Sequence, residues 1–423
     1  MLNKKILKDL KESVALEDLR IKNRIFNKTS FVNLVTDYYD NLDKVFNIEI
    51  GTHGVLDQKA TGRCWSYAGL NILREKVIEK CNLENFELSG SYIAFYDKLE
   101  RFSYLMDKLE DYSKKGNEYD RDIQRILKTG FDDGSNFTEF KVLIKKYGVV
   151  PKNKYSNGFQ TNDTGELNDI LSRLLRKYYL NLGDKNAKET YLKQVYKILT
   201  MVYGSPVDRF DFEYKDRKGV YHIDKSITPN QFYDKYIGID FSNYIEIYTF
   251  QDEKYKYNNM YDQKENTQID LKNESLILNL EYKELEKLIL KQLKKNEPVY
   301  FSSSTTTKYS NGLWIDLLDR YSSLLDIDLK MSNNEIKRTY GTQGEHSMLI
   351  TGASLKNDKV VFWKIENSWG EKEGLNGYFI AESKFLENYI ISAVINKEYL
   401  NKNQKELLKK KPIIVDKYDY RFC

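Results

Sequence analysis

The chain has 423 residues, of which 41% are hydrophobic and 14% aromatic, and this composition excludes an intrinsically disordered polymer. The 67 Lys and Arg residues nearly balance the 63 Asp and Glu residues, and the net charge of +4 argues against a dedicated nucleic-acid binder. No apolar run reaches the length of about 18 residues that a membrane span needs, and the charged N-terminal run is not expected to be a signal peptide.

The first part of the chain is predicted to be mainly helical. A leading helix over Lys4–Ile21 is followed by chain that we expect to be extended up to residue 50. A helix begins at Cys64, because apolar residues recur at helical spacing after it (Leu70, Leu73 and Val77). Further amphipathic runs predict helices over residues 91–112 and over Phe137–Tyr147.

The composition of the chain changes near residue 161 and again near residue 296. Residues 161–295 are dense in Lys, Asn, Tyr and Asp, and they predict helices over 166–202 and 283–295 with short strands between them. Apolar runs then predict three strands, of which the first two form a hairpin (Ser347–Ala353, Lys359–Ile365 and Gly377–Ala381). Helices first and strands last predict an α+β fold with a large, mainly helical insertion.

Cys64 is the leading candidate for a catalytic residue because it stands at the start of a predicted helix. A thiol there meets unpaired backbone N–H groups and the positive end of the helix dipole, which favour the thiolate. A lone cysteine is more often a small buried apolar residue. The catalytic interpretation therefore needs a base and a group that orients the base.

Both groups are present downstream. His346 lies just before one predicted strand and Asn367 closes the next, so neighbouring strands would bring them to one edge of a sheet. An Asn amide oxygen accepts from an imidazole N–H without adding charge, which suits a thiolate–imidazolium pair. Gln58 precedes Cys64 by six residues, and we expect its amide and the Cys64 N–H to form an oxyanion hole. Trp369 is expected to cover the His–Asn hydrogen bond.

The order of these residues resembles that of papain-like cysteine peptidases. Their Cys-Gly-[Ser/Ala]-Cys-[Trp/Tyr] signature is matched in part, with Thr61 in place of the first Cys and Arg63 in place of the small residue. Cys64 and His346 are 282 residues apart, against ~130–150 in papain-type chains, and the excess matches the segment 161–295. This combination is similar to the bleomycin hydrolase branch of the family, also called aminopeptidase C.

Several other runs are similar to this branch in the same order: SYIAFYDKLERFSYLMD, KKYGVVPK, TPNQFYDKYI, EPVYFSS and KKKPIIV. The resemblance implies a papain-like two-lobed fold, in which a helical lobe carries the nucleophile and a β-barrel-like lobe carries the His and the Asn. It divides the chain into the N-terminal segment with the helical lobe (1–160), the inserted arm segment (161–295), the β lobe (296–411) and a C-terminal arm (412–423).

The same resemblance implies a function. It predicts a cytoplasmic, homohexameric cysteine aminopeptidase that removes N-terminal residues from peptides with free N-termini, with no metal and no other cofactor. The family's Asp-Gly-Gly-Gln-Trp run is here Asp133-Gly134-Ser135-Asn136-Phe137, so Gly134 and Ser135 are expected to present backbone to the substrate. The terminal carboxylate of Cys423 is expected to lie in the cleft and meet the substrate's ammonium group.

The sequence leaves three alternative functions open. A papain-like endopeptidase would lack the gating by the C-terminal arm. A weak nucleic-acid binder could use the Lys-rich runs at 291–295 and 409–411, although a solvated surface of mixed charge is the simpler interpretation. A transglutaminase-like acyl transferase would orient its His with Asp rather than Asn. The three histidines are never at metal-ligand spacing, and three cysteines predict reduced thiols.

Overall fold

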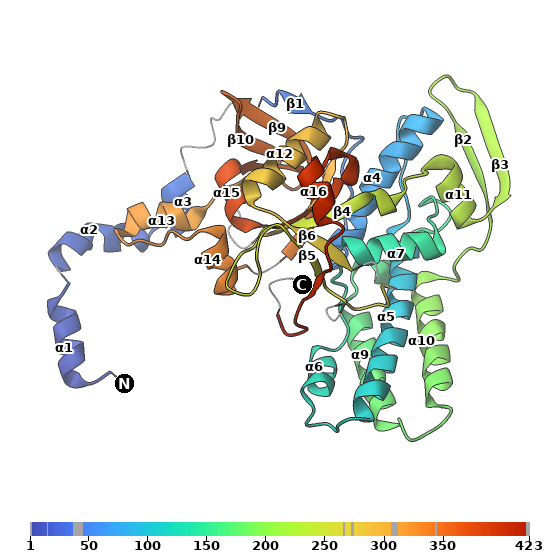
Figure 1. Cartoon of the computed structure of the whole chain (residues 1–423), viewed down its shortest axis with the longest axis horizontal. Helices are drawn as coiled ribbons and strands as arrows, with labels where there is room; N and C mark the ends of the chain where they lie inside the picture. The colour runs from blue at the N-terminus through green and yellow to red at the C-terminus, as the bar shows by residue number, and fades with distance from the viewer. Residues whose placement is uncertain are drawn as a thin grey trace.

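The computed structural model describes residues 2–14, 16–36, 45–264, 267–271, 275–305, 312–342 and 345–419. It shows a helical lobe beside a β lobe, with a helical arm that projects from the β lobe (Figure 1). The predicted α+β, papain-like class is confirmed. Within the described residues, no helix is both long enough and apolar enough to cross a bilayer.

The helical lobe is built around α4 (Cys64–Cys81), α5 (Gly90–Ser113) and α7 (Phe137–Tyr147), and all three predicted helices are confirmed. The apolar stripe of α4 is fully buried in the core of this lobe. A Cβ on Gly69 would lie 2.4 Å from the ring of Phe140, so the absence of a side chain lets α7 approach α4 closely. This contact fixes the helix that begins at Cys64 against the rest of the lobe.

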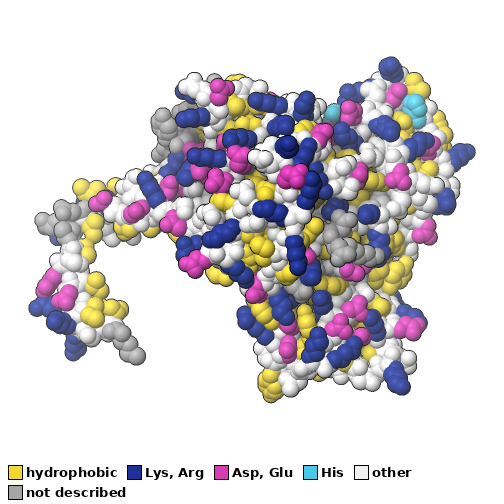
Figure 2. Space-filling view, viewed as in Figure 1, with side chains coloured by type: hydrophobic (Ala, Val, Ile, Leu, Met, Phe, Trp, Pro, Cys, Tyr) yellow, Lys and Arg dark blue, Asp and Glu magenta, His cyan; other side chains and the backbone are white. Residues whose placement is uncertain are grey.

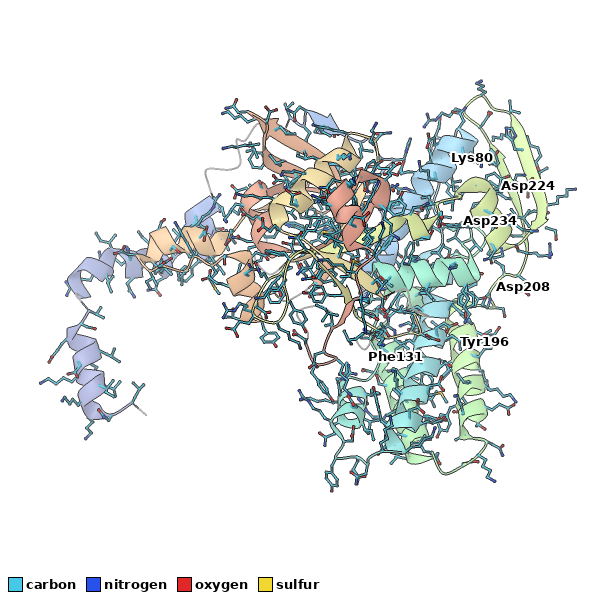
Figure 3. The ribbon with its side chains drawn as sticks, viewed as in Figure 1. Lys80, Phe131, Tyr196, Asp208, Asp224 and Asp234 are labelled. Carbon is cyan, nitrogen blue, oxygen red and sulfur yellow. The ribbon has the colours of Figure 1, made fainter. Side chains whose placement is uncertain are left out.

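The inserted segment extends this lobe. Its helices α9 (Gly165–Leu180) and α10 (Ala187–Tyr203) pack against α5. The hairpin of β2 (Phe210–Lys215) and β3 (Tyr221–Ile227) follows them in the chain and lies apart from them (Figure 1). The shorter helices of the lobe are α6 (Arg121–Thr129), α8 (Phe159–Asn162) and α11 (Pro229–Tyr236). Asp224 of the hairpin accepts from Tyr236 of α11 at 2.6 Å and pairs with Lys235, which holds the hairpin on the lobe (Figure 3).

The β lobe contains one mixed sheet in the described part of the chain, with the strand order β13-β5-β6-β4-β12-β7-β9-β10-β11-β8, and β1 pairs with β9. The strands are β1 (Ile48–Glu49), β4 (Tyr244–Tyr248), β5 (Asn259–Asp262), β6 (Leu276–Asn279), β7 (Val299–Ser304), β8 (Leu313–Trp314), β9 (Glu345–Lys356), β10 (Lys359–Glu366), β11 (Tyr378–Glu382), β12 (Ile390–Asn396) and β13 (Ile413–Ile414). Helices α12 (Tyr282–Leu293) and α15 (Ser383–Tyr389) pack against the sheet, and α13 (Leu317–Leu325), α14 (Asn333–Arg338) and α16 (Lys402–Leu407) complete the lobe.

The predicted hairpin near the C-terminal end is confirmed as β9 and β10. Its turn residues Asn357 and Asp358 have φ angles of 52° and 59°, a left-handed conformation that Asn and Asp tolerate better than other side chains. Strands β4, β5 and β6 come from the segment that the sequence assigned to the insertion, yet they belong to the main sheet. We therefore propose that the insertion ends near residue 243 rather than at 295.

The N-terminal segment differs from the prediction. One helix over Lys4–Ile21 followed by extended chain was expected, but the structure has α1 (Lys4–Glu12), α2 (Leu16–Phe26) and α3 (Phe31–Thr36). Val32 and Val35 of α3 pack against a small core beside α13, a tertiary contact that the local pattern does not reveal. Apolar side chains remain exposed along the arm, among them Ile6, Leu10 and Ile21 (Figure 2).

Candidate active site

Cys64 is the first residue of α4, and its thiol is half-buried where α4 packs against β9. The backbone N–H groups of Cys64, Trp65 and Ser347 and the Ser347 hydroxyl lie near the sulfur. Burial raises the pKa of the thiol, while these donors act in the opposite direction because they stabilise the thiolate. The sulfur therefore lies among donors that suit a negative charge.

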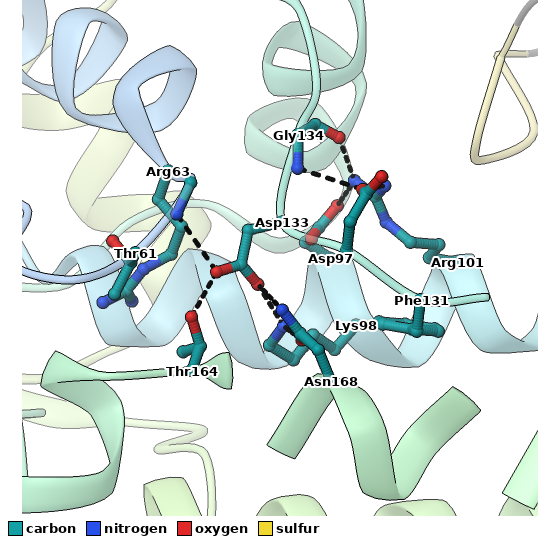
Figure 4. Close-up of polar contacts among 12 residues, drawn as sticks. Thr61, Arg63, Asp97, Lys98, Arg101, Phe131, Asp133, Gly134, Thr164 and Asn168 are labelled. Atoms are coloured by element: carbon teal, nitrogen blue, oxygen red, sulfur yellow. Dashed lines mark hydrogen bonds and ion pairs between the residues drawn. The ribbon is translucent and has the colours of Figure 1, made fainter. Parts of the chain in front are cut away.

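The turn before Cys64 is held by the buried carboxylate of Asp133 (Figure 4). Its Oδ2 accepts from the Gly62 N–H at 3.2 Å, and its Oδ1 pairs with the ammonium of Lys98. Its backbone carbonyl accepts from the indole N–H of Trp65 at 2.8 Å. Burial alone would raise the pKa of Asp133, but Lys98 and its hydrogen bonds outweigh this effect and hold the pKa well below its usual range. Asp133 therefore anchors both sides of the nucleophile, with its carboxylate at Gly62 and its backbone carbonyl at Trp65.

The loop after Asp133 is held by Arg101 (Figure 4). Arg101 donates to the Gly134 carbonyl at 2.8 Å and to Asp132 at 3.0 Å, and the Gly134 N–H donates to Asp132 at 3.1 Å. The Ser135 hydroxyl donates to Glu139, so its side chain is engaged within the protein. Among the described residues, no hydrogen bond uses the N–H or C=O of Ser135. Of the two residues singled out in the sequence, Gly134 is internally bonded and Ser135 has free backbone groups.

The side chains of His346 and Asn367 meet where β9 begins and β10 ends, as their positions on neighbouring strands predicted. The Nε2 of His346 lies 2.6 Å from the Oδ1 of Asn367, and both side chains are buried, with 7% and 1% of their surfaces exposed. The imidazole stacks on Trp369 with ring centroids 4.8 Å apart, so Trp369 covers the hydrogen bond as expected. Because an amide oxygen can only accept, Nε2 carries the proton and Nδ1 is the nitrogen that can change protonation state.

The nucleophile candidate and the base candidate are brought together by β9. His346 and Ser347 are the second and third residues of β9, which packs against α4, the helix that begins at Cys64. Catalysis by Cys64 and His346 requires these two residues to lie close together, although 282 residues separate them in the chain. The helical lobe supplies the thiol and the β lobe supplies the imidazole, so the pair lies at the junction of the two lobes.

Gln58 is buried in the loop that precedes α4. Its Oε1 accepts from the Ser368 hydroxyl at 2.6 Å, and its Nε2 donates to the Thr61 carbonyl at 2.6 Å. An amide nitrogen has two N–H groups, so one donor remains after the bond to Thr61. Ser368 directly follows Asn367, and the Gln58 side chain is therefore oriented by the strand end that also orients the imidazole.

The C-terminal segment runs from the β lobe to the helical lobe. β13 pairs with β5, and the next residues reach α6, where Lys417 and Tyr418 both contact Asp122. The guanidinium of Arg121 lies 3.8 Å from the centroid of the Tyr418 ring. Burial would raise the pKa of Asp122, but Lys417 and Tyr418 together lower it. The segment is thus fixed up to Asp419, whereas Cys423 lies outside the described residues.

Sequence reasoning missed two groups of the site. Asp133 was noted only as part of a motif, although an acidic residue that precedes a Gly-containing loop could have indicated an anchor. Ser347 was included in a strand but was given no role, although its place directly after His346 was visible. Within the described residues, no group of three His, Cys, Asp or Glu side chains is placed to hold a metal ion.

Comparisons with known proteins agree with this geometry. Residues 3–420 match the model of the peptidase C1-like family. Aminopeptidase C of Lactobacillus helveticus is 34% identical over 379 residues, which cover 86% of this chain and 84% of the relative. Aminopeptidase C of Listeria monocytogenes is 31% identical over 398 residues, with 90% and 88% covered. The crystal structure of PepW from Lactobacillus rhamnosis has a TM-score of 0.91 at 29% identity and covers 99% of this chain.

Proposed function

The chain belongs to the peptidase C1-like family and is a cysteine-type aminopeptidase, and we propose that Cys64, His346 and Asn367 are its catalytic residues. The observation that carries this assignment is the buried 2.6 Å contact between Nε2 of His346 and Oδ1 of Asn367. It fixes the tautomer and the ring orientation of a histidine on β9, the strand that packs against the helix beginning at Cys64.

The geometry supports the following chemistry. The Cys64 thiolate attacks the peptide carbonyl, and the sulfur–carbon bond forms as the carbonyl oxygen becomes an oxyanion. The imidazolium of His346 then gives its Nδ1 proton to the leaving amine, which departs and leaves an acyl-enzyme. His346 next takes a proton from water, the hydroxide attacks the thioester, and the thiolate leaves. Asn367 keeps the ring in place throughout, since a rotated imidazole could not serve both steps.

We assign the oxyanion hole to Gln58 and the Cys64 N–H. The Ser368 hydroxyl fixes one end of the Gln58 amide, so its donors are preorganised rather than mobile. Gln58→Ala should lower kcat by roughly 10²–10³-fold, because one donor to the transition-state charge is lost. KM should change little. Steady-state kinetics on a short peptide would measure the fall in kcat and the nearly constant KM. An unchanged kcat in a folded variant would show that Gln58 is not part of the site.

Substrate main chain is proposed to bind along Ser135. Its N–H and C=O have no partner among the described residues, whereas the neighbouring Gly134 is bonded to Arg101 and Asp132. Gly134 therefore supports the loop, and Ser135 offers one donor and one acceptor to an extended peptide. A complex with a peptide aldehyde would reveal whether peptide atoms pair with this backbone.

Aminopeptidase specificity is proposed to come from the C-terminal arm. Residues 413–418 are fixed on β5 and on Asp122 of α6, so the last residues start from a defined point between the lobes. The terminal carboxylate, which belongs to Cys423, would then face the ammonium of a substrate in a poorly solvated cleft. An anion at that place favours free amino termini and blocks longer binding modes.

Ending the chain at Asp416 should relax this specificity. The full-length enzyme is expected to cleave a free peptide much faster than its N-acetylated form, and the shortened enzyme should accept blocked and internal sites. The measurement compares both peptides with both proteins, and Asp122→Ala, which releases the anchor of Lys417 and Tyr418, should shift the preference in the same direction. If the full-length enzyme cleaved both peptides equally, it would be an endopeptidase and the arm would have no gating role.

We also propose that the enzyme assembles as a homohexamer and works in the cytoplasm. Support for assembly comes from the arm of α1 and α2, which projects from the β lobe and exposes Ile6, Leu10 and Ile21 (Figures 1 and 2). Such an apolar face is typical of a surface that packs against another molecule. The molecular mass in solution tests the assembly. A reducing compartment would keep the Cys64 thiol active.

The alternative of a nucleic-acid binder gains no support from the Lys-rich runs. Lys409 pairs with Glu406 at 2.7 Å, Lys410 donates to the Asn258 carbonyl at 3.0 Å, and Lys291 donates to the Tyr399 carbonyl at 2.9 Å. These ammonium groups serve local contacts on a surface where acidic side chains are interspersed (Figure 2).

A further inference from the structure

The carboxylate of Glu139 connects two parts of the protein that are far apart in the chain. Glu139 lies in the first turn of α7 and is 1% exposed. Its Oε2 accepts from the hydroxyl of Ser135, and its Oε1 accepts from the backbone N–H of Gln268 at 2.7 Å. In a capping box, a glutamate at this third helical position accepts from the N-cap backbone N–H. Here both oxygens are used by other donors, which indicates a role other than helix capping.

The loop of residues 132–136, called here the Ser135 loop, is fixed from inside the helical lobe. Arg101 of α5 is fully buried and donates to the Gly134 carbonyl at 2.8 Å (Figure 4). The same guanidinium lies 3.9 Å from Oε2 of Glu139. The guanidinium therefore holds the backbone of Gly134, and the carboxylate holds the side chain of Ser135. The backbone N–H and C=O of Ser135 have no partner among the described residues.

Gln268 belongs to the segment 267–271, which lies between β5 and β6 of the β lobe in the chain. Its neighbours Ile269 and Leu271 are buried in the core of the helical lobe. The segment therefore crosses from one lobe to the other. Because Glu139 accepts from Gln268, this crossing segment and the Ser135 loop share one buried anchor.

We propose that Glu139 is a positioning residue for substrate binding, which holds the Ser135 loop so that the N–H and C=O of Ser135 face the peptide main chain. This inference rests on the proposed binding of substrate along Ser135. Glu139 itself touches no reacting atom and transfers no proton. Its effect is expected on substrate and transition state alike, because a main-chain contact is made in both. A preorganised loop also loses less conformational entropy when the peptide binds.

Glu139→Gln tests the proposal, because it keeps the size of the side chain and changes its hydrogen bonding. A carboxylate has two acceptor oxygens and an amide has one, so either the Ser135 hydroxyl or the Gln268 N–H loses its acceptor. On a short free peptide, the full-length variant should show KM raised about tenfold, the order expected when one hydrogen bond is lost, with kcat unchanged. Alkylation of Cys64 by iodoacetamide without substrate should keep its wild-type rate.

Ser135→Ala removes the other partner of the contact and leaves the backbone groups in place. It should raise KM by a smaller factor than Glu139→Gln. The double variant should raise KM by less than the product of the two single factors, because the hydroxyl and the carboxylate act through one contact. If the Glu139→Gln protein does not fold, Ser135→Ala decides.

Glu110→Gln is the matched control. Glu110 lies at the C-terminal end of α5, away from the start of α7. Its carboxylate also accepts from a hydroxyl, that of Tyr178, and also lies 3.9 Å from a cation, the ammonium of Lys188. Both KM and kcat of this variant should equal those of the wild type.

An unchanged KM in Glu139→Gln or, where that variant fails to fold, in Ser135→Ala would overturn the proposal. So would a fall in kcat at least as large as the rise in KM, which is the result of a general structural defect, or an equal rise in KM in Glu110→Gln. Failure of the proposed binding mode gives a different result, because a bound peptide aldehyde would then not pair with the Ser135 backbone. A wrong nucleophile would be revealed by hydrolysis that survives Cys64→Ala.

Discussion

Cys64→Ala is expected to abolish peptide hydrolysis, with a fall in kcat on the order of 10⁶, as when a peptidase loses its nucleophile. The thioester cannot form without the sulfur, and no other described thiol can replace it, because Cys81 is buried at the far end of α4. The fold should persist, since the substitution removes one half-buried atom beside Ser347. Hydrolysis of a short free peptide, measured with far-ultraviolet circular dichroism on the same sample, tests both statements.

Cys81→Ala provides the matched control. Cys81 is 3% exposed and lies in the core of the helical lobe, away from the junction with the β lobe. Its removal should lower stability slightly and leave kcat unchanged. Full turnover by a folded Cys64→Ala protein would contradict the assignment of the nucleophile, whatever the control showed.

His346→Ala is expected to have the second largest effect, a loss of roughly 10²–10⁴-fold in kcat, because a positioned proton donor and acceptor is removed. Asn367→Ala should lower kcat by a smaller factor, since the imidazole stays stacked on Trp369 even without the Asn367 oxygen at 2.6 Å. The pH dependence of kcat should lose its imidazole limb in His346→Ala and keep it in Asn367→Ala. Steady-state kinetics across pH would measure both.

His222→Ala is the control for this pair. His222 lies on the β2–β3 hairpin, where its ring stacks on Tyr214 and 40% of the side chain is exposed. It should have no effect on kcat at any pH. If Asn367→Ala proved more damaging than His346→Ala, the roles given to the two residues would be wrong.

The order in which the functional residues appear was readable without any coordinates. The helix at Cys64 was predicted from apolar residues that recur every three or four positions. The β9–β10 hairpin was predicted from two apolar runs that flank Asn357 and Asp358. Both features depend on contacts between near neighbours in the chain, which the sequence displays directly. The His–Asn pair was inferred because two adjacent strands of a hairpin must bring their ends together.

Other features depend on residues far apart in the chain. The anchoring of Gly62 by Asp133 joins positions 71 residues apart, and the β4–β6 strands enter the main sheet only because that sheet offers them partners. The helix α3 forms where Val32 and Val35 meet a core built by residues near 317. Local periodicity in the sequence does not show such distant partners, so these elements were missed or assigned to another segment.

The sequence by itself indicated the family and predicted the nucleophile and its two partners, because the chemistry of a thiol peptidase demands particular residue types in a particular order. The tertiary structure decided what surrounds them. Asp133 is one acidic residue among many in the sequence, and its role as an anchor of the turn before Cys64 is visible only when Gly62 and Lys98 lie against its carboxylate. The physical reason is that a hydrogen bond depends on distance and direction in space, and neither is encoded by spacing along the chain.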